Sequence, residues 1–109
     1  MLHRLLVVAL RVLFVKPWVE ALEPALEALR GCGLDVTYER VDLVPAFWAA
    51  LERDRWDVVV VDWKTPELTL AVVSKIVREH RAELPVVVLD RLEILGRDVL
   101  RAVSRQATG

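Results

Sequence analysis

The stretch Trp56-Asp57-Val58-Val59-Val60-Val61-Asp62-Trp63-Lys64-Thr65-Pro66 decides the fold of this chain. Its four consecutive valines are β-branched and too few for an independent helix, so they predict a strand. A strand that is apolar on both faces is typical of the centre of a parallel sheet. It would carry Asp62 to the carboxyl edge of the sheet, where open α/β sheets bind ligands. Asp also starts turns, so taken alone Asp62 is an equally good turn residue.

Length and charge limit the chain to one domain and exclude some partners. The chain has 109 residues, with 15 basic and 16 acidic side chains and a formal net charge of -1. This balance favours no nucleic-acid surface, so we expect no nucleic-acid partner. Hydrophobic residues make up 55% of the chain and the mean hydropathy is +0.37. These values are high for a small domain and predict an apolar surface that a protein partner covers.

The single cysteine and the apolar N-terminus both favour a cytoplasmic protein. Cys32 cannot form an intrachain disulfide alone, and His3 and His80 are remote from it in sequence, so neither a catalytic thiol nor a zinc site is expected. The apolar run over residues 5–15 is interrupted by Arg11 and is shorter than the roughly 20 residues that span a bilayer, and no small-residue cleavage site follows it. We therefore expect no membrane association.

Strand-like and helix-like segments alternate along the chain. Strands are expected over 11–15, 34–40, 58–61 and 86–89, with residues 1–10 as an N-terminal apolar extension that could form an additional strand. Helices are expected over about 20–31, 44–51, 67–81 and 98–106. Such alternation implies right-handed crossovers and a parallel sheet with helices on both faces.

The same patterns predict which side chains are buried. On the first three helices, an apolar stripe at helical spacing is expected to face the sheet. In the strand over 34–40, alternate residues are expected to point inward. The buried positions are predicted to include Leu26, Leu29, Leu34, Val36, Tyr38, Phe47, Leu51, Leu70, Val72, Val73, Ile76, Val77, Val99, Leu100 and Val103.

Four motifs in order resemble the receiver domains of bacterial response regulators. The segment from Asp62 to Pro66 is similar to the family's phospho-acceptor segment, Asp-x-x-x-Pro after the third strand, with Asp62 at the acceptor position. The run from Leu84 to Leu89 resembles the lead into the fourth strand, the run from Arg11 to Val15 the first strand, and Gly33 the glycine after the first helix. The resemblance covers residues 11–109. It implies a flavodoxin-like parallel sheet with strand order 2-1-3-4 and a place in two-component phosphorelay signalling.

The chain departs from that family at the pocket that the resemblance implies. The family's first strand ends in two acids that hold Mg²⁺, and Lys16 and Pro17 stand there. Asp90 replaces the Ser or Thr that ends the fourth strand and receives a phosphoryl oxygen. The family's fifth strand, which carries a phosphate-binding Lys, and its fifth helix are missing. Phosphoryl transfer needs a hard cation with anionic ligands, whereas a Lys ammonium could pair with Asp62 instead.

Two interpretations of the pocket formed by Lys16, Pro17, Asp62, Trp63, Lys64 and Asp90 follow. We favour a degenerate, truncated receiver: a pseudo-receiver that acts as a protein-interaction module, is not an enzyme and needs no cofactor or metal. The alternative is a working receiver, phosphorylated on Asp62 by a histidine kinase, with Asp62 and Asp90 holding Mg²⁺ weakly. A small enzyme with these two acids as an acid-base pair is a third class, but no nucleophile or cofactor motif supports it.

The apolar surplus suggests how a partner binds. Without a fifth strand, residues 86–89 would form an unpaired hydrophobic edge, which invites pairing with another chain. Residues 2–10 could supply that strand from a second copy, so we expect a homodimer. Alternatively, a histidine kinase, an adjoining output domain or the remainder of a larger protein covers the edge. Trp63, directly after Asp62 in sequence, could contact such a partner.

Overall fold

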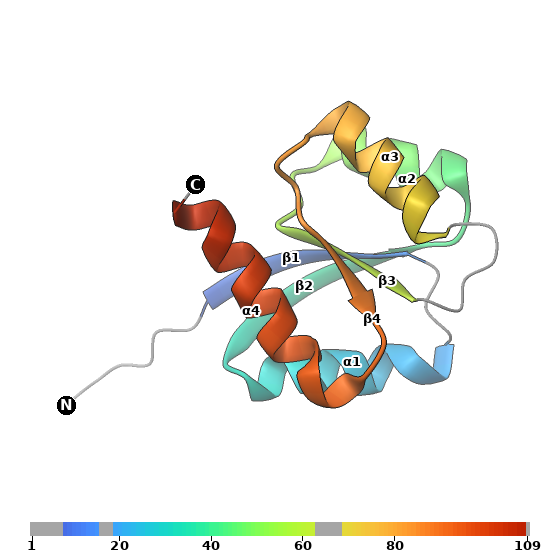
Figure 1. Ribbon diagram of the computed structural model, residues 1–109. Helices are drawn as coiled ribbons and strands as arrows, with labels where there is room; N and C mark the ends of the chain where they lie inside the picture. The colour runs from blue at the N-terminus through green and yellow to red at the C-terminus, as the bar shows by residue number, and fades with distance from the viewer. Residues whose placement is uncertain (1–7, 16–18, 63–68, 109) are drawn as a thin grey trace.

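The structure is a computed structural model that describes residues 8–15, 19–62 and 69–108. Strands and helices alternate through these ranges, as the sequence predicts (Figure 1). In chain order the elements are β1 (Val8–Val15), α1 (Val19–Gly31), β2 (Leu34–Val41), α2 (Val44–Arg53), β3 (Val58–Asp62), α3 (Leu70–His80), β4 (Val86–Leu89) and α4 (Leu92–Thr108).

The four strands form one parallel sheet in the order β2-β1-β3-β4. β1 pairs with β2 along its whole length, whereas its second half alone pairs with β3. This arrangement confirms the predicted flavodoxin-like strand order. β2 and β4 are therefore the two edges of the sheet.

β3 is an inner strand because both of its faces are covered. All five of its residues are buried. Val58 and Val60 belong to one hydrophobic cluster and Val59 and Val61 to another, on opposite faces of the sheet. The valine run therefore serves both cores at once, which explains why it lacks the polar alternation of β2.

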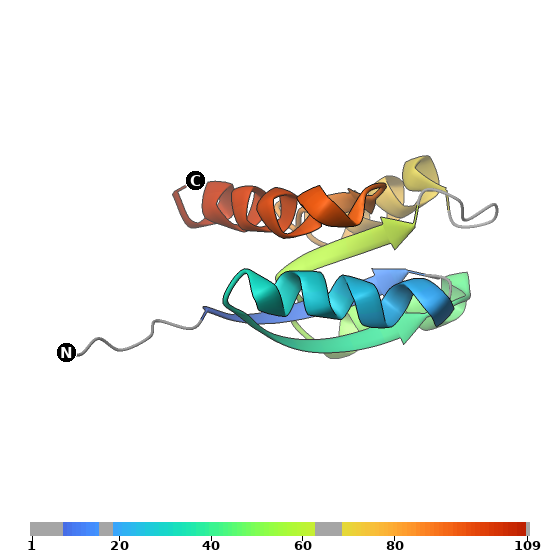
Figure 2. The same cartoon turned by 90° about the horizontal axis from the view of Figure 1, so that it is seen from below.

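Two helices cover each face of the sheet (Figures 1 and 2). α1 and α4 pack together on one face, where Leu26, Leu29, Leu95 and Val99 are buried. α2 and α3 cover the other face, where Phe47, Leu51, Val73, Ile76 and Val77 are buried. These two layers confirm the predicted helical stripes for most positions.

α4 is longer than the sequence predicts. It begins at Leu92 and not near Asp98, and it includes Gly96. Glycine is unfavourable in the interior of a helix. Here, however, a Cβ at position 96 would overlap Sγ of Cys32 and lie 3.4 Å from the carbonyl oxygen of Ala28. Gly96 therefore allows α4 to pack closely on α1, and this tertiary contact extends the helix past a residue of low propensity.

The face of the sheet that α4 covers bears on where the sheet ends. α4 covers the same face as α1, opposite α3. A right-handed crossover from β4 to a fifth strand beyond it would place the connecting helix on the face of α3. In the part of the chain that the structure describes, α4 instead packs beside α1, and β4 is the last strand of the sheet.

Some side chains are more exposed than predicted. Tyr38 is 40% exposed and meets the ring of Phe14 edge-on, with ring centroids 5.9 Å apart. Leu70 and Val72 are 46% and 37% exposed. Both lie in the first turn of α3, N-terminal to the buried residues Val73, Ile76 and Val77, so helical spacing alone overestimated the buried stripe. Leu100 and Val103 are only partly buried, because they flank the stripe formed by Leu95 and Val99.

The N-terminal extension in part continues β1. Val8, Ala9 and Leu10 pair with Leu34, Asp35 and Val36 of β2. These three residues are therefore engaged within their own chain and are not free to add a strand to β4 of a second copy. Residues 1–7 lie outside the described ranges.

Candidate functional site

Asp62 ends β3 at the carboxyl edge of the sheet, where the sequence places the candidate site. It is the one charged residue among the buried residues of the described chain, with 6% of its surface exposed. By strand alternation, its side chain lies on the face of Val58 and Val60, below α1 and α4. Asp62 takes part in a polar interaction within the chain. Burial of a carboxylate requires such compensation, so the position is specified by more than a turn preference.

Strand register brings the neighbouring candidate positions to the same edge. Val15, the last residue of β1, pairs with Val61, and Asp62 pairs with Leu89, the last residue of β4. Asp90 follows directly and is exposed. Lys16 and Pro17 follow Val15 in the sequence, and Trp63 and Lys64 follow Asp62, but these four residues lie outside the described ranges.

The described part of this edge offers three carboxylates: the buried Asp62, the exposed Asp90, and the half-buried Asp42 after β2, which pairs with Arg40. Across residues 8–15, 19–62 and 69–108, no three His, Cys, Asp or Glu side chains gather closely enough to hold a metal ion. None of the described helices is both long and apolar enough to cross a membrane.

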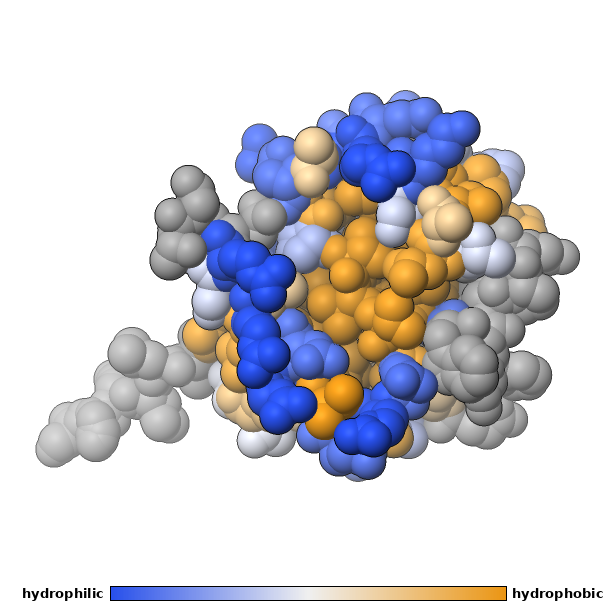
Figure 3. Space-filling model, viewed as in Figure 1, coloured by the Kyte–Doolittle hydropathy of each residue, from blue (hydrophilic) through white to orange (hydrophobic). Residues whose placement is uncertain are grey.

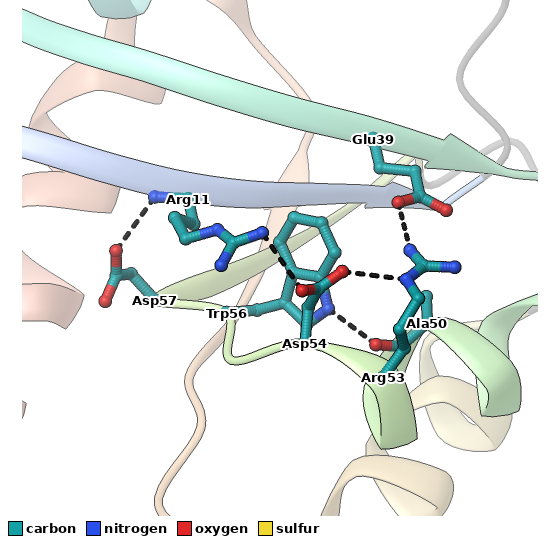
Figure 4. A network of polar contacts seen from close by, with 7 residues as sticks. All are labelled: Arg11, Glu39, Ala50, Arg53, Asp54, Trp56 and Asp57. Carbon is teal, nitrogen blue, oxygen red and sulfur yellow. Dashed lines mark hydrogen bonds and ion pairs between the residues drawn. The ribbon is translucent and has the colours of Figure 1, made fainter.

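A polar network that the sequence did not reveal lies at the opposite end of β3 (Figure 4). The backbone N–H of Arg11 donates to Oδ2 of Asp57 over 2.8 Å, and the N–H of Asp57 donates to the carbonyl oxygen of Arg11 over 2.8 Å. This reciprocal pair fixes the start of β3 beside β1. In the sequence, Asp57 directly precedes the valine run, but the strand pattern alone does not predict that its carboxylate accepts a backbone hydrogen bond.

Side-chain ion pairs extend this network to the β2 edge. Asp54 accepts a hydrogen bond from Nε of Arg53 over 2.8 Å and lies 3.4 Å from the guanidinium of Arg11. Arg53 also pairs with Glu39 of β2. The hydrogen bond from Arg53, followed by the charge of Arg11, lowers the pKa of Asp54 below its ordinary value. The pKa of Arg53 is raised, chiefly by its hydrogen bond to Asp54.

Trp56 is the apolar centre of this network. It is 3% exposed, its Nε1 donates to the carbonyl oxygen of Ala50 over 2.9 Å, and the guanidinium carbon of Arg11 lies 5.0 Å from its ring centroid. The side chain thus ties the end of α2 to β1 and β3. This arrangement supports a structural role for the network, because its aromatic member is buried and its charged side chains are held in ion pairs or hydrogen bonds.

His80 of α3 makes a further set of polar contacts, which join α3 to α2. Its ring lies 4.1 Å from that of Trp48, and Nδ1 is 3.4 Å from the carbonyl oxygen of Ile76. Nε2 is 3.8 Å from a carboxylate oxygen of Glu52. The position near the C-terminus of α3 agrees with the sequence, whereas the tilted ring contact with Trp48 is a tertiary contact that joins the two helices.

Comparison with known proteins places the fold among flavodoxin-like α/β domains. No protein-family model matches the chain, and no curated protein matches it. Among solved structures, it is similar to a response regulator from Thermotoga maritima, with a TM-score of 0.62 and 20% sequence identity. The match covers 91% of this chain and 99% of the other. At this identity the likeness is one of fold, and it shows that the chain has a receiver-like fold.

Proposed function

We propose that the chain is a receiver-like protein-interaction domain of the phosphorelay class, in which Asp62 has a structural role and does not accept phosphate. The observation that carries this proposal is the register at the carboxyl edge. Val15 pairs with Val61 and Asp62 with Leu89, and Lys16 and Asp90 are the residues that follow Val15 and Leu89 in the sequence.

The residue types at these positions argue against phosphoryl transfer. Mg²⁺ requires oxygen ligands around a transferring phosphoryl group, and a lysine adds positive charge without a ligand. Asp90 adds negative charge where a phosphate oxygen would arrive. An ammonium group could instead pair with Asp62 and compensate part of the cost of burying its carboxylate.

The proposal therefore assigns no enzymatic activity and no cofactor to the chain, and it assigns signalling to contact with a protein partner. A histidine kinase or an adjoining output domain is the kind of partner that a receiver-like fold suggests. The mean hydropathy of +0.37 supports a partner-covered apolar surface.

Intact-mass measurement after incubation with acetyl phosphate and Mg²⁺ tests this proposal. We expect the mass of the wild-type chain to be unchanged, with an active receiver domain phosphorylated in parallel as the control. A phosphoryl adduct on the wild-type chain that Asp62→Ala lacks would contradict the proposal.

The alternative is a working receiver phosphorylated on Asp62. The observation that favours it is that Asp62 pairs with Leu89 and Asp90 directly follows Leu89 at the same edge, where two carboxylates could bind Mg²⁺ weakly. The same assay decides between the two. An adduct that depends on both Asp62 and Mg²⁺ would establish the alternative.

A further inference from the structure

The β4 edge is an apolar surface with a hydrophilic border. Figure 3 views the molecule from the side of β4 and shows a continuous hydrophobic area between the polar residues of α4 and those near α3. β4 has the sequence VVVL, and Val86 and Val88 are only partly buried. A contiguous apolar patch with a polar border is typical of a protein-protein interface.

The peptide groups of β4 divide between a paired side and an open side. The N–H of Val59 donates to the carbonyl oxygen of Pro85 over 3.0 Å. In a parallel ladder, alternate residues direct their N–H and C=O groups to the same side. Pro85, Val87 and Leu89 therefore face β3, and the N–H and C=O groups of Val86 and Val88 face the open edge.

A second copy satisfies these groups most simply through antiparallel pairing. A two-fold axis perpendicular to the sheet at Val87 places Val86 of each copy opposite Val88 of the other. Each such pair exchanges both N–H···O=C hydrogen bonds, so both residues of both strands are satisfied. If the axis passes instead at Val86 or Val88, that residue pairs with the same residue of the second copy. The remaining valine then lies opposite a residue outside the partner's β4.

α4 fits the same symmetry. It packs on β4 and, less closely, on β3, so the α4 helices of two such copies lie on the same face of the joined sheet, side by side across the axis. Gly96 faces α1, and Asp98 and Arg101 are roughly 200° and 140° further round the helix, on the flank away from α1. In the described part of the chain, neither of these two side chains makes an ion pair.

Because the two α4 helices run antiparallel, the charges of Asp98 and Arg101 on this flank are self-complementary. Asp98 precedes Arg101 along the helix, so reversing the partner brings its Arg101 towards Asp98 and its Asp98 towards Arg101. Charges ordered in this way favour a second copy over an unrelated acidic or basic strand.

We propose that two copies of this chain join their β4 edges antiparallel about Val87, forming one continuous sheet with Asp98 and Arg101 of facing α4 helices in reciprocal ion pairs. This proposal names a second copy of the chain as the partner of the interaction domain proposed above. The role of the dimer in signalling rests on that proposed function, whereas its geometry does not. The proposed dimer differs from strand exchange because the N-terminal segment contributes nothing to the interface.

Analytical ultracentrifugation tests the edge itself. We expect the wild-type chain to be a dimer at about 50 µM. Val88→Lys places a charge at the open edge and is expected to weaken the dimer by roughly a hundredfold. Thr37→Lys, on the exposed face of the β2 edge, is the matched control and should leave the dimer unchanged. A wild-type monomer at about 200 µM would overturn the proposal.

Charge reversal tests the register without relying on a variant that could misfold. Asp98→Arg should weaken the dimer by about tenfold, because like charges then face each other across the axis. The exchange Asp98→Arg with Arg101→Asp should restore wild-type affinity, since the order of charges is reversed in both copies. Failure of the exchange to restore affinity while circular dichroism shows a folded chain would contradict the proposed pairing. The acetyl phosphate assay remains independent, so a monomer that is also unphosphorylated contradicts only the dimer.

Discussion

The two edges of the sheet differ in length, charge and support. β2 is an eight-residue strand with exposed Asp35, Thr37 and Arg40, and its Glu39 pairs with Arg53 of α2. β4 has four residues, all Val or Leu. Charged side chains along an edge strand discourage pairing with other chains, whereas an apolar edge invites it. The comparison indicates that β2 is a protected edge and β4 an edge suited to a partner.

The largest expected effect concerns the helix that covers β4. Gly96→Leu should lower the free energy of unfolding by about 3 kcal/mol, because a side chain at this position overlaps Cys32 and separates α4 from α1. Gly31→Leu is the matched control, since a Cβ there meets no atom within 4 Å. Urea denaturation monitored by tryptophan fluorescence provides the measurement. Equal stability of both variants would show that α4 is not held by this contact.

The polar network at the start of β3 should give an intermediate loss of stability when it is broken. Asp57→Ala removes the acceptor for the Arg11 N–H, whose hydrogen bond is 2.8 Å long, and should cost about 1 kcal/mol of unfolding free energy. The control Asp35→Ala removes an exposed carboxylate from β2 and should change stability by less than about 0.5 kcal/mol. The two unfolding midpoints, compared at the same pH, measure the difference. A larger loss for Asp35→Ala would contradict the role assigned to Asp57.

The smallest effect is the pH dependence of the Asp54 ion pairs. The folded-state pKa of Asp54 lies below its ordinary value of 3.8, because of the hydrogen bond from Arg53 and the charge of Arg11. Its ionised form therefore stabilises the fold above the unfolded-state pKa, and this contribution is lost as the pH falls through the folded-state pKa. We expect Asp54→Asn to be less stable than wild type at neutral pH, with the difference shrinking below pH 3.8.

Urea titrations of wild type and Asp54→Asn between about pH 2 and pH 7 would measure that difference. Asp35→Asn changes the charge by the same amount at a residue without an ion pair in the described chain, and it serves as the control. A difference between wild type and Asp54→Asn that grows on acidification would show that the ion pairs do not stabilise the folded state.

Strand periodicity determined more of the fold than helix periodicity did. The valine run predicted β3, and the run from Val86 to Leu89 predicted β4 at the observed bounds. A strand pattern repeats every two residues and survives in short segments. The first half of α4 was missed because Gly96 lowers helix propensity locally, and only the contact with α1 explains its place in a helix. Leu70 and Val72 were misplaced because a helical stripe does not show where the sheet beneath it ends.

For the candidate site, sequence predicted the position of Asp62 but not its burial or the network at the other end of β3. The residue types Lys16, Pro17 and Asp90 were visible from the sequence, and the register of β1, β3 and β4 showed that Asp62 and the strand ends preceding these residues meet at one edge. The Arg11, Asp54 and Asp57 contacts join residues more than 40 positions apart. No local pattern specifies such pairs.

The sequence by itself determined the alternation of strands and helices, the central position of β3 and the residue types at the carboxyl edge, because hydrophobic periodicity and local propensity are written along the chain. Only the tertiary structure decided that α4 shares a face with α1, that Val8–Val15 pairs fully with β2, and that the peptide groups of Val86 and Val88 face outward. These features depend on which surfaces meet in space. Side-chain packing and strand register decide which surfaces meet, and neither can be read from the sequence alone.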